Sequence, residues 1–307
     1  MTRRRGFILV LVTLVVGGLL VFIGEIDHGV SLSSVLEIWS DVLRDADQFG
    51  FRLTRVSDRE EMRVGNELAG RVKGWWHEDP ARERYVGVVG QALLAHIHRK
   101  GIPYEFHVLE SRQVNAFALP GGQIFVMTGM LEFLRSEAEL AAVLGHEISH
   151  VDLRHCIERF QYELALKKVG ARELGALAEI ARRLLTSGYN KYQELDADAH
   201  GVRLSLLAGY DPEAGAVVFN RLKERSREPP PPRAQTALGE ITQAMEQAME
   251  SYFRSHPTSD ERARQLDRLV ATNRRRLVGE TFYVGVENYR RQIPRTQQEF
   301  PDERRRF

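Results

Sequence analysis

The chain has 307 residues, enough for one sizeable globular domain with appendages. Hydrophobic residues make up 43% of it and charged residues 28%, a balance typical of a globular fold and unlike that of a disordered chain or a polytopic membrane protein. Lys and Arg number 43 against 42 for Asp and Glu, so no excess of positive charge favours a nucleic-acid partner, and we expect none. Cys156 is the single cysteine. It excludes an intramolecular disulfide and a cysteine-rich metal site, so a bound metal must rely on histidine and carboxylate ligands.

The amino-terminal residues predict a membrane anchor. Arg3 to Arg5 precede a stretch without charges from Phe7 to Gly24, which as a helix would be roughly 27 Å long, close to the hydrocarbon thickness of a bilayer. A cleaved signal peptide is the alternative, but its apolar core is usually shorter and ends in a small-x-small site, which is missing here. The arginines should remain in the cytoplasm. We therefore expect a single-pass protein of the inner (cytoplasmic) membrane whose later residues are extracytoplasmic, in the periplasm of a bacterium with two membranes.

Beyond a connecting segment, the hydrophobic pattern changes from a helical period to a strand period. Apolar residues recur at helical spacing over residues 59–73 and 81–100. Residues 104–108 alternate between polar and apolar side chains, as a strand does. Two apolar segments flank the turn-forming Pro120-Gly121-Gly122 and predict a hairpin, with strands over 114–119 and 123–127.

The rest of the chain is predicted to be mainly helical. Ser136, with Glu139 three residues later, is a capping-box pattern that predicts the start of a helix running through His150. The segment 229–233 is rich in proline and predicts an exposed loop. Further helices are expected over residues 152–168, 173–186, 189–207, 236–253 and 260–275. The predicted fold class is therefore α+β, mostly helical, with a small antiparallel sheet beside the helix that contains His150.

The segment from Gly145 to His150 carries the pattern H-E-x-x-H. Residues four apart project from one face of a helix, so the imidazoles of His146 and His150 can reach a single ion. Glu147 can face a water at that ion without binding the ion itself, and can take the proton as the water attacks a carbonyl. The alternative is a pair of buried helix histidines satisfied by their neighbours. The pattern predicts a metallopeptidase site with two histidine ligands and Glu147 as the base.

A third ligand is predicted downstream, at Glu194. Glu194 and Asp198 are four apart and face the same way on a helix, which suits a glutamate that binds the metal and an aspartate that orients a ligand imidazole. Without the two histidines, the same residues would indicate only an acidic surface turn of a helix. His155 lies nine positions after His146 and would point to the opposite side of a continuous helix. We expect it at the surface or in a second layer around the site.

Several segments together resemble the membrane-associated zinc metallopeptidase family that includes HtpX, the CAAX prenyl protease and the periplasmic protease BepA (peptidase family M48). They occur in the family's order and span about half of the chain. They are Asn115 to Gly122, Gly145 to Val151 with Arg154-His155, Glu194 with Asp198, and His256-Pro257 followed by Arg262.

The resemblance implies a zinc metalloendopeptidase of the gluzincin type with a zincin-like fold. One Zn²⁺ per chain would be held by His146, His150 and Glu194, with Glu147 as the catalytic base. Asp198 would lie in the second layer around the metal and contact a ligand. Substrates would be polypeptides.

Two further roles are implied by the resemblance. The hairpin would offer an exposed edge, around Asn115, Ala116 and Phe117, on which a substrate peptide adds as a strand; a purely structural hairpin is the alternative. His256 would bind the oxyanion of the tetrahedral intermediate or cover the zinc in a resting state. Otherwise it merely begins a helix before Pro257.

The resemblance and the predicted anchor together suggest misfolded or misassembled proteins at the extracytoplasmic face of the membrane as substrates, with envelope assembly machinery as a candidate partner. The alternative is a non-catalytic zinc-containing chaperone or assembly factor for envelope proteins, although a structural site needs no carboxylate beside its first ligand.

Unlike the polytopic prenyl protease, the chain has no second apolar stretch of membrane-spanning length after Ser31. The expected organisation is a basic cytoplasmic tail (1–6), a transmembrane anchor (7–24), a connecting segment (25–58), a zinc metallopeptidase domain (59–290) and a C-terminal tail (291–307).

Overall fold

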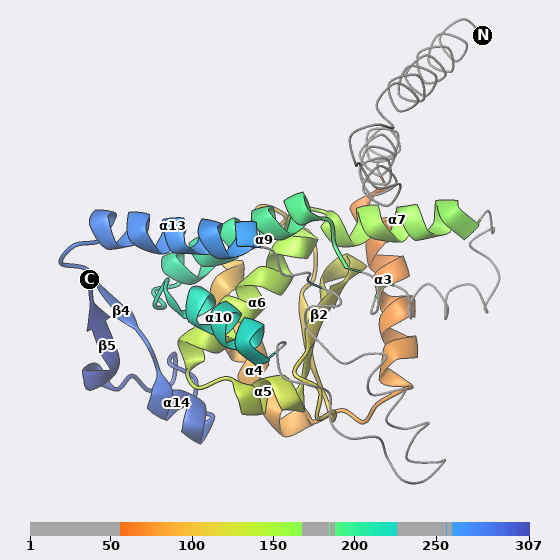
Figure 1. The fold of residues 1–307 in the computed structure, drawn as a ribbon. Helices are drawn as coiled ribbons and strands as arrows, with labels where there is room; N and C mark the ends of the chain where they lie inside the picture. The colour runs from red at the N-terminus through yellow and green to blue at the C-terminus, as the bar shows by residue number, and fades with distance from the viewer. Residues whose placement is uncertain (1–55, 168–183, 185–187, 226–255, 257–259) are drawn as a thin grey trace, which may run out of the picture. The chain divides into compact units, whose positions relative to one another are not determined.

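The computed structural model describes residues 56–167, 184, 188–225, 256 and 260–307 (Figure 1). In chain order, the elements that position the site are α3 (Asp58–Lys73), α4 (Pro80–Leu94), β1 (Glu105–Leu109), β2 (Ala116–Leu119), η2 (Pro120–Gly122), β3 (Gln123–Met127), α5 (Thr128–Phe133), α6 (Glu137–Asp152), α7 (His155–Lys167), α9 (Lys191–Leu207), α10 (Ala214–Arg225) and α13 (Asp260–Arg276). They are followed by β4 (Thr281–Tyr283), α14 (Val286–Arg291), η3 (Pro301–Glu303) and β5 (Arg304–Arg306). The predicted class, α+β and mostly helical with a small sheet, is confirmed.

Several predicted segments lie outside the described residues: the anchor at 7–24, the connecting segment as far as residue 55, the helix at 236–253, the loop at 229–233, and the helix at 173–186 apart from Leu184. Among the helices that the structure does describe, none is both long and apolar enough to cross a membrane. Residues 56–307 belong to one unit of internal contacts.

The three-stranded sheet is mixed, not antiparallel as predicted. Its order is β1-β3-β2, with β3 antiparallel to β2 and parallel to β1. β2 and β3 form a hairpin as expected, and β3 is the central strand, between β2 and β1. Alternation of side chains is the same in both kinds of ladder, so it could not reveal this direction of pairing. An isolated bridge joins Glu78 to Leu109 at the end of β1, and no other described strand pairs with the outer edge of β2.

Side-chain caps start the helices near the sheet and the site. Ser57 and Asn190 form complete capping boxes at the starts of α3 and α9. At α6 the Ser136 hydroxyl accepts a hydrogen bond from the Glu139 amide, 3.2 Å away, but the Glu139 carboxylate bonds the Arg135 amide instead of returning to Ser136. The predicted helix start is therefore right and the predicted box is half formed.

Helix α4 ends at Leu94, earlier than the predicted residue 100. Lys100 donates from its ammonium to the carbonyls of Leu94 and Ala95, which satisfies acceptors at the end of the helix. The amide of His98 donates to the Asp152 carboxylate at the end of α6 instead of to a helix carbonyl. The contact with α6 thus ends α4, and local apolar spacing does not report such a contact.

Helix α6 is buried along nearly its whole length and packs against α4, α9, α10 and β2 (Figure 1). Every residue of α6 except Ala142 is buried, so all sides of the helix lie in the core, the ionisable side chains included. Side chains of β2 divide between two clusters: Ala116 and Ala118 pack with α6, whereas Phe117 and Leu119 face the cluster containing α3. The sheet is thus filled on both faces, and one of them carries α6.

Two glycines allow α6 and α9 to cross closely. A Cβ added at Gly145 would lie 3.0 Å from the Gly201 carbonyl oxygen, and one added at Gly201 would lie 2.9 Å from the His146 amide nitrogen. Those neighbours are backbone atoms, so they cannot rotate away. The crossing therefore requires residues without side chains, and it brings the acidic start of α9 against the histidines of α6.

The C-terminal residues hold the start of α6. The Glu137 carboxylate accepts hydrogen bonds from the hydroxyls of Tyr85 (3.0 Å) and Tyr210 (2.8 Å) and from the amide of Arg295 (3.0 Å). The Glu137 amide donates to the carbonyl of Gly285, 3.0 Å away. Within the segment expected as a tail, β5 pairs antiparallel with β4. Residues 291–307 therefore contribute to the folded unit.

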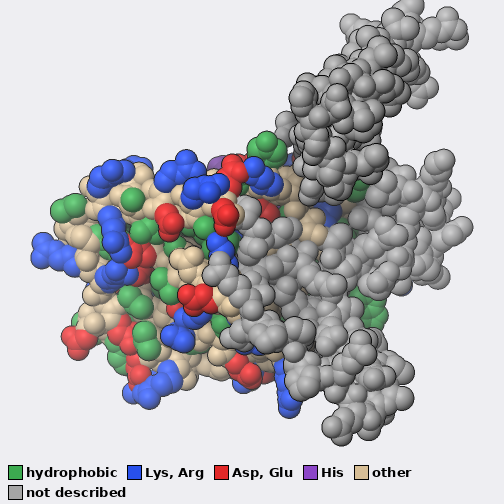
Figure 2. Space-filling view, viewed as in Figure 1, with side chains coloured by type: hydrophobic (Ala, Val, Ile, Leu, Met, Phe, Trp, Pro, Cys, Tyr) green, Lys and Arg blue, Asp and Glu red, His purple; other side chains and the backbone are tan. Residues whose placement is uncertain are grey.

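The surface carries mixed charge. On the face shown in Figure 2, Lys and Arg side chains are interspersed with Asp and Glu and are not gathered in one patch. Several form exposed ion pairs such as Arg290–Glu287, at 2.7 Å. Pairs of this kind contribute little to stability.

We predict that Gly201→Ala destabilises the fold by about 1–3 kcal/mol, because the added methyl meets the backbone of α6. Alanine has the higher helix propensity, by about 1 kcal/mol, but this gain cannot remove the clash. Chemical denaturation measures the change. Gly87→Ala in α4 is the matched control, because nothing lies within 4 Å of a Cβ at that position. Equal or higher stability of Gly201→Ala would contradict the close crossing.

Candidate metal centre

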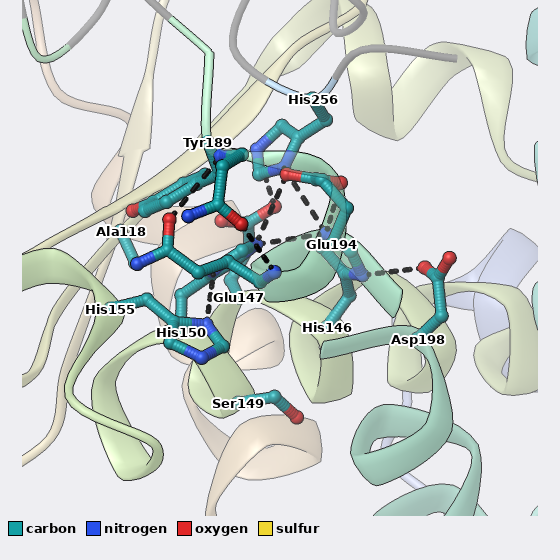
Figure 3. A network of polar contacts seen from close by, with 12 residues as sticks. Ala118, His146, Glu147, Ser149, His150, His155, Tyr189, Glu194, Asp198 and His256 are labelled. Carbon is teal, nitrogen blue, oxygen red and sulfur yellow. Dashed lines mark hydrogen bonds and ion pairs between the residues drawn. The ribbon is translucent and has the colours of Figure 1, made fainter. Parts of the chain in front are cut away.

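Helices α6 and α9 place the predicted ligands in one buried cluster. His146 and His150 come from α6 and Glu194 from the first turn of α9, and their side chains point toward one another (Figure 3). His256 joins them. Each of the four offers one ligand atom, and these atoms all lie within 4.8 Å of one another. The cluster is fully buried, so its polar atoms depend on one another or on a ligand.

The spacing of these atoms fits a four-coordinate ion. His146 Nε2 lies 3.1 Å from His150 Nε2, and Glu194 oxygens lie 3.5 Å from each of these nitrogens. His256 Nδ1 lies 3.1 Å from His146 Nε2 and 3.0 Å from Glu194 Oε1. Four ligands at about 2.0–2.1 Å from a tetrahedral zinc lie about 3.3 Å from one another. Nitrogen and carboxylate oxygen are also ligand types that zinc accepts, so the residues present fit this metal.

Neighbouring side chains fix the orientation of both α6 imidazoles. His146 Nδ1 lies 3.0 Å from Asp198 Oδ1. His150 Nδ1 lies 3.1 Å from His155 Nδ1, and the Tyr189 ring stacks on His150 with centroids 3.7 Å apart. Groups of this kind set ring orientation and tautomer in metal sites. Burial also lowers the pKa of His150 well below its usual value, which leaves the ring neutral and able to offer a lone pair.

His155 is buried and lies in the second layer, one of the two places expected for it; the surface position was wrong. The expectation assumed one continuous helix. Instead α6 ends at Asp152, and Arg154 adopts a left-handed conformation with φ of 70°. The break turns the chain so that α7 begins at His155 beside His150. A left-handed arginine is uncommon, and nothing in the local pattern predicts it.

Glu147 faces the same cluster and accepts no hydrogen bond from the described residues. Its side chain is fully buried, and among the described residues neither carboxylate oxygen has a hydrogen-bond partner. Oε1 lies 3.3 Å from His256 Nε2 in an ion-pair contact. Burial raises the pKa of Glu147 above its ordinary value, against the lowering effect of His256 and His146. A buried carboxylate held beside a metal-binding cluster is suited to exchanging a proton with a molecule that enters the site.

Arg262 was part of the sequence pattern, after His256-Pro257, but that pattern assigned it no role. It is almost fully buried, and its Nε and Nη2 each bond one oxygen of Asp198 at 2.8 Å. Its Nη1 lies 2.5 Å from Glu194 Oε2 and donates to the His256 carbonyl, 3.2 Å away. Although burial raises it, the pKa of Glu194 is brought well below its ordinary value by Arg262 and His256. One guanidinium thus holds the ligand Glu194, the supporting Asp198 and the backbone of His256.

The predicted substrate residues do not reach the cluster with their side chains. Asn115, Ala116 and Phe117 are all buried, and none contributes an atom to the ligand set. Phe117 stacks on Phe125 with centroids 5.0 Å apart and belongs to the core. Ala118 of β2 lies beside the site (Figure 3). Its carbonyl oxygen accepts a hydrogen bond from Cys156 Sγ, 3.7 Å away.

The family model for Peptidase family M48 matches residues 80–270, which include both helices of the cluster. The chain belongs to peptidase family M48. The matched segment contains His146, Glu147, His150, Glu194, Asp198, His256 and Arg262.

Curated relatives within the family have similar sequences. The mitochondrial metalloendopeptidase OMA1 of Schizosaccharomyces pombe is 28% identical over 190 residues, which are 60% of this chain and 51% of the relative. The OMA1 of Arabidopsis thaliana is 30% identical over 183 residues, 57% of this chain and 33% of the relative. The beta-barrel assembly-enhancing protease of Escherichia coli (strain K12) is 26% identical over 193 residues, 56% and 39% of the two chains. The chain thus spans between a third and a half of these relatives.

We predict that Arg262→Lys lowers zinc affinity by about 10–100-fold, because an ammonium cannot reproduce the two-pronged contact with Asp198 while also reaching Glu194. Competition with a chromogenic chelator measures the affinity, and circular dichroism checks that the fold is kept. Arg264→Lys, an exposed position on the same helix, is the control and should bind zinc as the wild type does. Unchanged affinity in a folded Arg262→Lys variant would show that Arg262 does not position the ligands.

Proposed function

We propose that this protein is a zinc-dependent endopeptidase, with the ion held by His146, His150 and Glu194. The observation that carries the proposal is the position of Glu194, whose carboxylate oxygens lie 3.5 Å from the imidazole nitrogens of both α6 histidines. Membership of a peptidase family and similarity to proteins named metalloendopeptidases support it. Asp198 contacts the His146 ring and His155 contacts the His150 ring, and these contacts fix the orientation of the two imidazoles.

Zinc, when bound, acts as a Lewis acid toward water and toward the carbonyl of the scissile bond. Glu147 supplies the proton transfer. One of its oxygens takes a proton from the attacking water, and the same carboxyl group then gives a proton to the amine of the leaving peptide. Its burial keeps bulk water away from these oxygens, so the proton goes to the substrate rather than to solvent.

His256 has two proposed roles, at the oxyanion or as a cover on the zinc in a resting state. Its Nδ1 lies among the ligand atoms and its Nε2 faces Glu147, which supports the covering role in this conformation. A water and a substrate carbonyl need that same corner of the site. His256 must therefore leave it during catalysis, and the oxyanion role requires the displaced ring to stay within hydrogen-bond reach of the substrate carbonyl.

We infer that a substrate polypeptide adds as a strand along the outer edge of β2, at Asn115, Ala116 and Phe117. No other strand among the described residues pairs with the outer edge of β2, and Ala118 lies beside the site; both observations support this. Asn115, Ala116 and Phe117 are at most 3% exposed as whole residues, so this edge is not exposed as expected and would have to be uncovered before a substrate pairs with it. Backbone hydrogen bonds would then provide the recognition, and little sequence preference would arise there. Misfolded chains with exposed backbone are substrates of this kind.

We propose that residues 7–24 anchor the protein in the inner membrane and that residues 59–290 form the catalytic domain outside the cytoplasm, joined by the segment 25–58. The arginines before residue 7 support this orientation. Envelope assembly machinery is a proposed partner, which the name of the Escherichia coli relative, a beta-barrel assembly-enhancing protease, supports.

We predict that Glu147→Gln lowers casein cleavage by about 10²–10⁴-fold while zinc content is kept, because the amide cannot take the water proton. Glu194→Ala should lose both activity and zinc, because it removes a ligand. Glu132→Gln, exposed on α5, is the matched control with full activity. Product ends identified by mass spectrometry should lie inside the casein chains. If wild type and Glu147→Gln both retain zinc and neither cleaves, the protein is a non-catalytic zinc-containing factor.

The anchor is tested with a reporter. Alkaline phosphatase, which is active only after export, is fused after residue 58 of the full amino-terminal sequence. We expect phosphatase activity in the membrane fraction that resists carbonate extraction, because the basic residues keep the start of the chain in the cytoplasm. Inactive fusions, or release of the reporter from the membrane, would contradict the orientation or the anchor respectively.

A further inference from the structure

A second cluster of ligand-type side chains lies away from the first. It consists of His98 in the connection after α4, Asp152 at the end of α6 and His200 in α9. His98 Nδ1 and His200 Nε2 each lie 2.9 Å from the same oxygen, Asp152 Oδ2. Three elements that are distant in sequence thus meet at one carboxylate oxygen. This cluster shares no residue with the zinc site.

The spacing of this cluster suits a six-coordinate ion. Ligands at about 2.1 Å that meet at right angles around such an ion lie about 3.0 Å apart, close to both observed distances. The imidazole rings of His98 and His200 have centroids 4.9 Å apart. In the zinc cluster the corresponding ring distances of His146, His150 and His256 range from 4.8 to 5.2 Å. His98 and His200 are thus about as far apart as the proposed ligands His146 and His150, but their rings are stacked, with an interplanar angle of 16° against 79°.

The carboxylate of this cluster is held in advance of binding. The amide of His98 lies 3.0 Å from both Asp152 oxygens, and the amide of Arg99 lies 2.7 Å from Oδ1. The Arg99 guanidinium does not compete for the site, because it is paired with Asp58 and Glu61. Outer contacts that fix a ligand carboxylate raise metal affinity.

An ion can reach the cluster from solvent. The side chains of Asp152 and His200 are buried, whereas 62% of the His98 side chain is exposed. The ion would thus enter on the His98 side, and water could fill the remaining positions. A buried ligand pair with one exposed histidine is an arrangement that exchanges metal with its surroundings.

We propose that His98, Asp152 and His200 form a second metal site, which takes a six-coordinate divalent transition-metal ion on two imidazoles and one carboxylate. Carboxylate and imidazole together suit ions from Fe²⁺ to Ni²⁺ in this geometry. Binding there clamps the end of α6, two residues after His150, to α9 and to the connection after α4. The site is independent of the proposed peptidase activity.

Co²⁺ is the probe, because four-coordinate Co²⁺ absorbs strongly in the visible range and six-coordinate Co²⁺ weakly. The full chain, stripped of metal in detergent, is dialysed against buffered Co²⁺, and bound cobalt is counted by mass spectrometry. We expect two ions per wild-type chain, one with the strong band and one without it. Glu194→Ala should lose the strong band and keep the other ion.

His98→Ala should keep the strong band and bind the second ion about tenfold more weakly or worse. The substitution lies at an exposed side chain, so the fold should tolerate it, and Asp152→Asn gives a second test by removing the negative ligand. His96→Ala, in the same connection but outside the cluster, should bind two ions. The proposal is overturned if the wild type binds one ion only, as it would if the short distances are hydrogen bonds alone, or if His98→Ala binds both ions as the wild type does.

Discussion

The close crossing of α6 and α9 is the constraint on which the site depends. A zinc ion demands ligand atoms within a few tenths of an ångström of their places, and these atoms come from two helices. Helices with ordinary side chains between them stand 8–10 Å apart, according to the size of those side chains. With Gly145 opposite Gly201, the backbones make direct contact, and Glu194 is brought to the histidines of α6. A larger residue at either glycine would move an entire ligand-bearing helix.

The balance of charge in the site bears on how so many ionisable groups can be buried together. Glu147, Glu194 and Asp198 are buried together with a single guanidinium, that of Arg262. When all three carboxyl groups are ionised, this leaves two negative charges without a partner among these groups, and such charges are costly in an interior. A divalent cation at the proposed metal site would balance them. Burial raises the pKa of Glu147 even though His256 and His146 lower it, which shows how costly a charge is at this position.

Much of this site was predictable from sequence because helical spacing is local. The spacing of His146 and His150, and that of Glu194 and Asp198, placed each pair on one helix face, and the structure brings the two pairs together. Features that depend on tertiary contacts could not be predicted from spacing along the chain. The direction of pairing of β1, the early end of α4 and the break at Arg154 each follow from contacts between distant segments. Tyr189 acts by stacking on His150, and Arg262 by its hydrogen bonds to Asp198, contacts that no spacing rule records.

The hydrogen bonds around Glu137 affect the order in which the protein can be completed during synthesis. The first turn of α6 is held by the amide of Arg295, which is 158 residues further along the chain. A ribosome therefore releases the metal-binding helix well before it makes the residues that secure its beginning. A nascent chain thus has no fully supported α6 until those last contacts form.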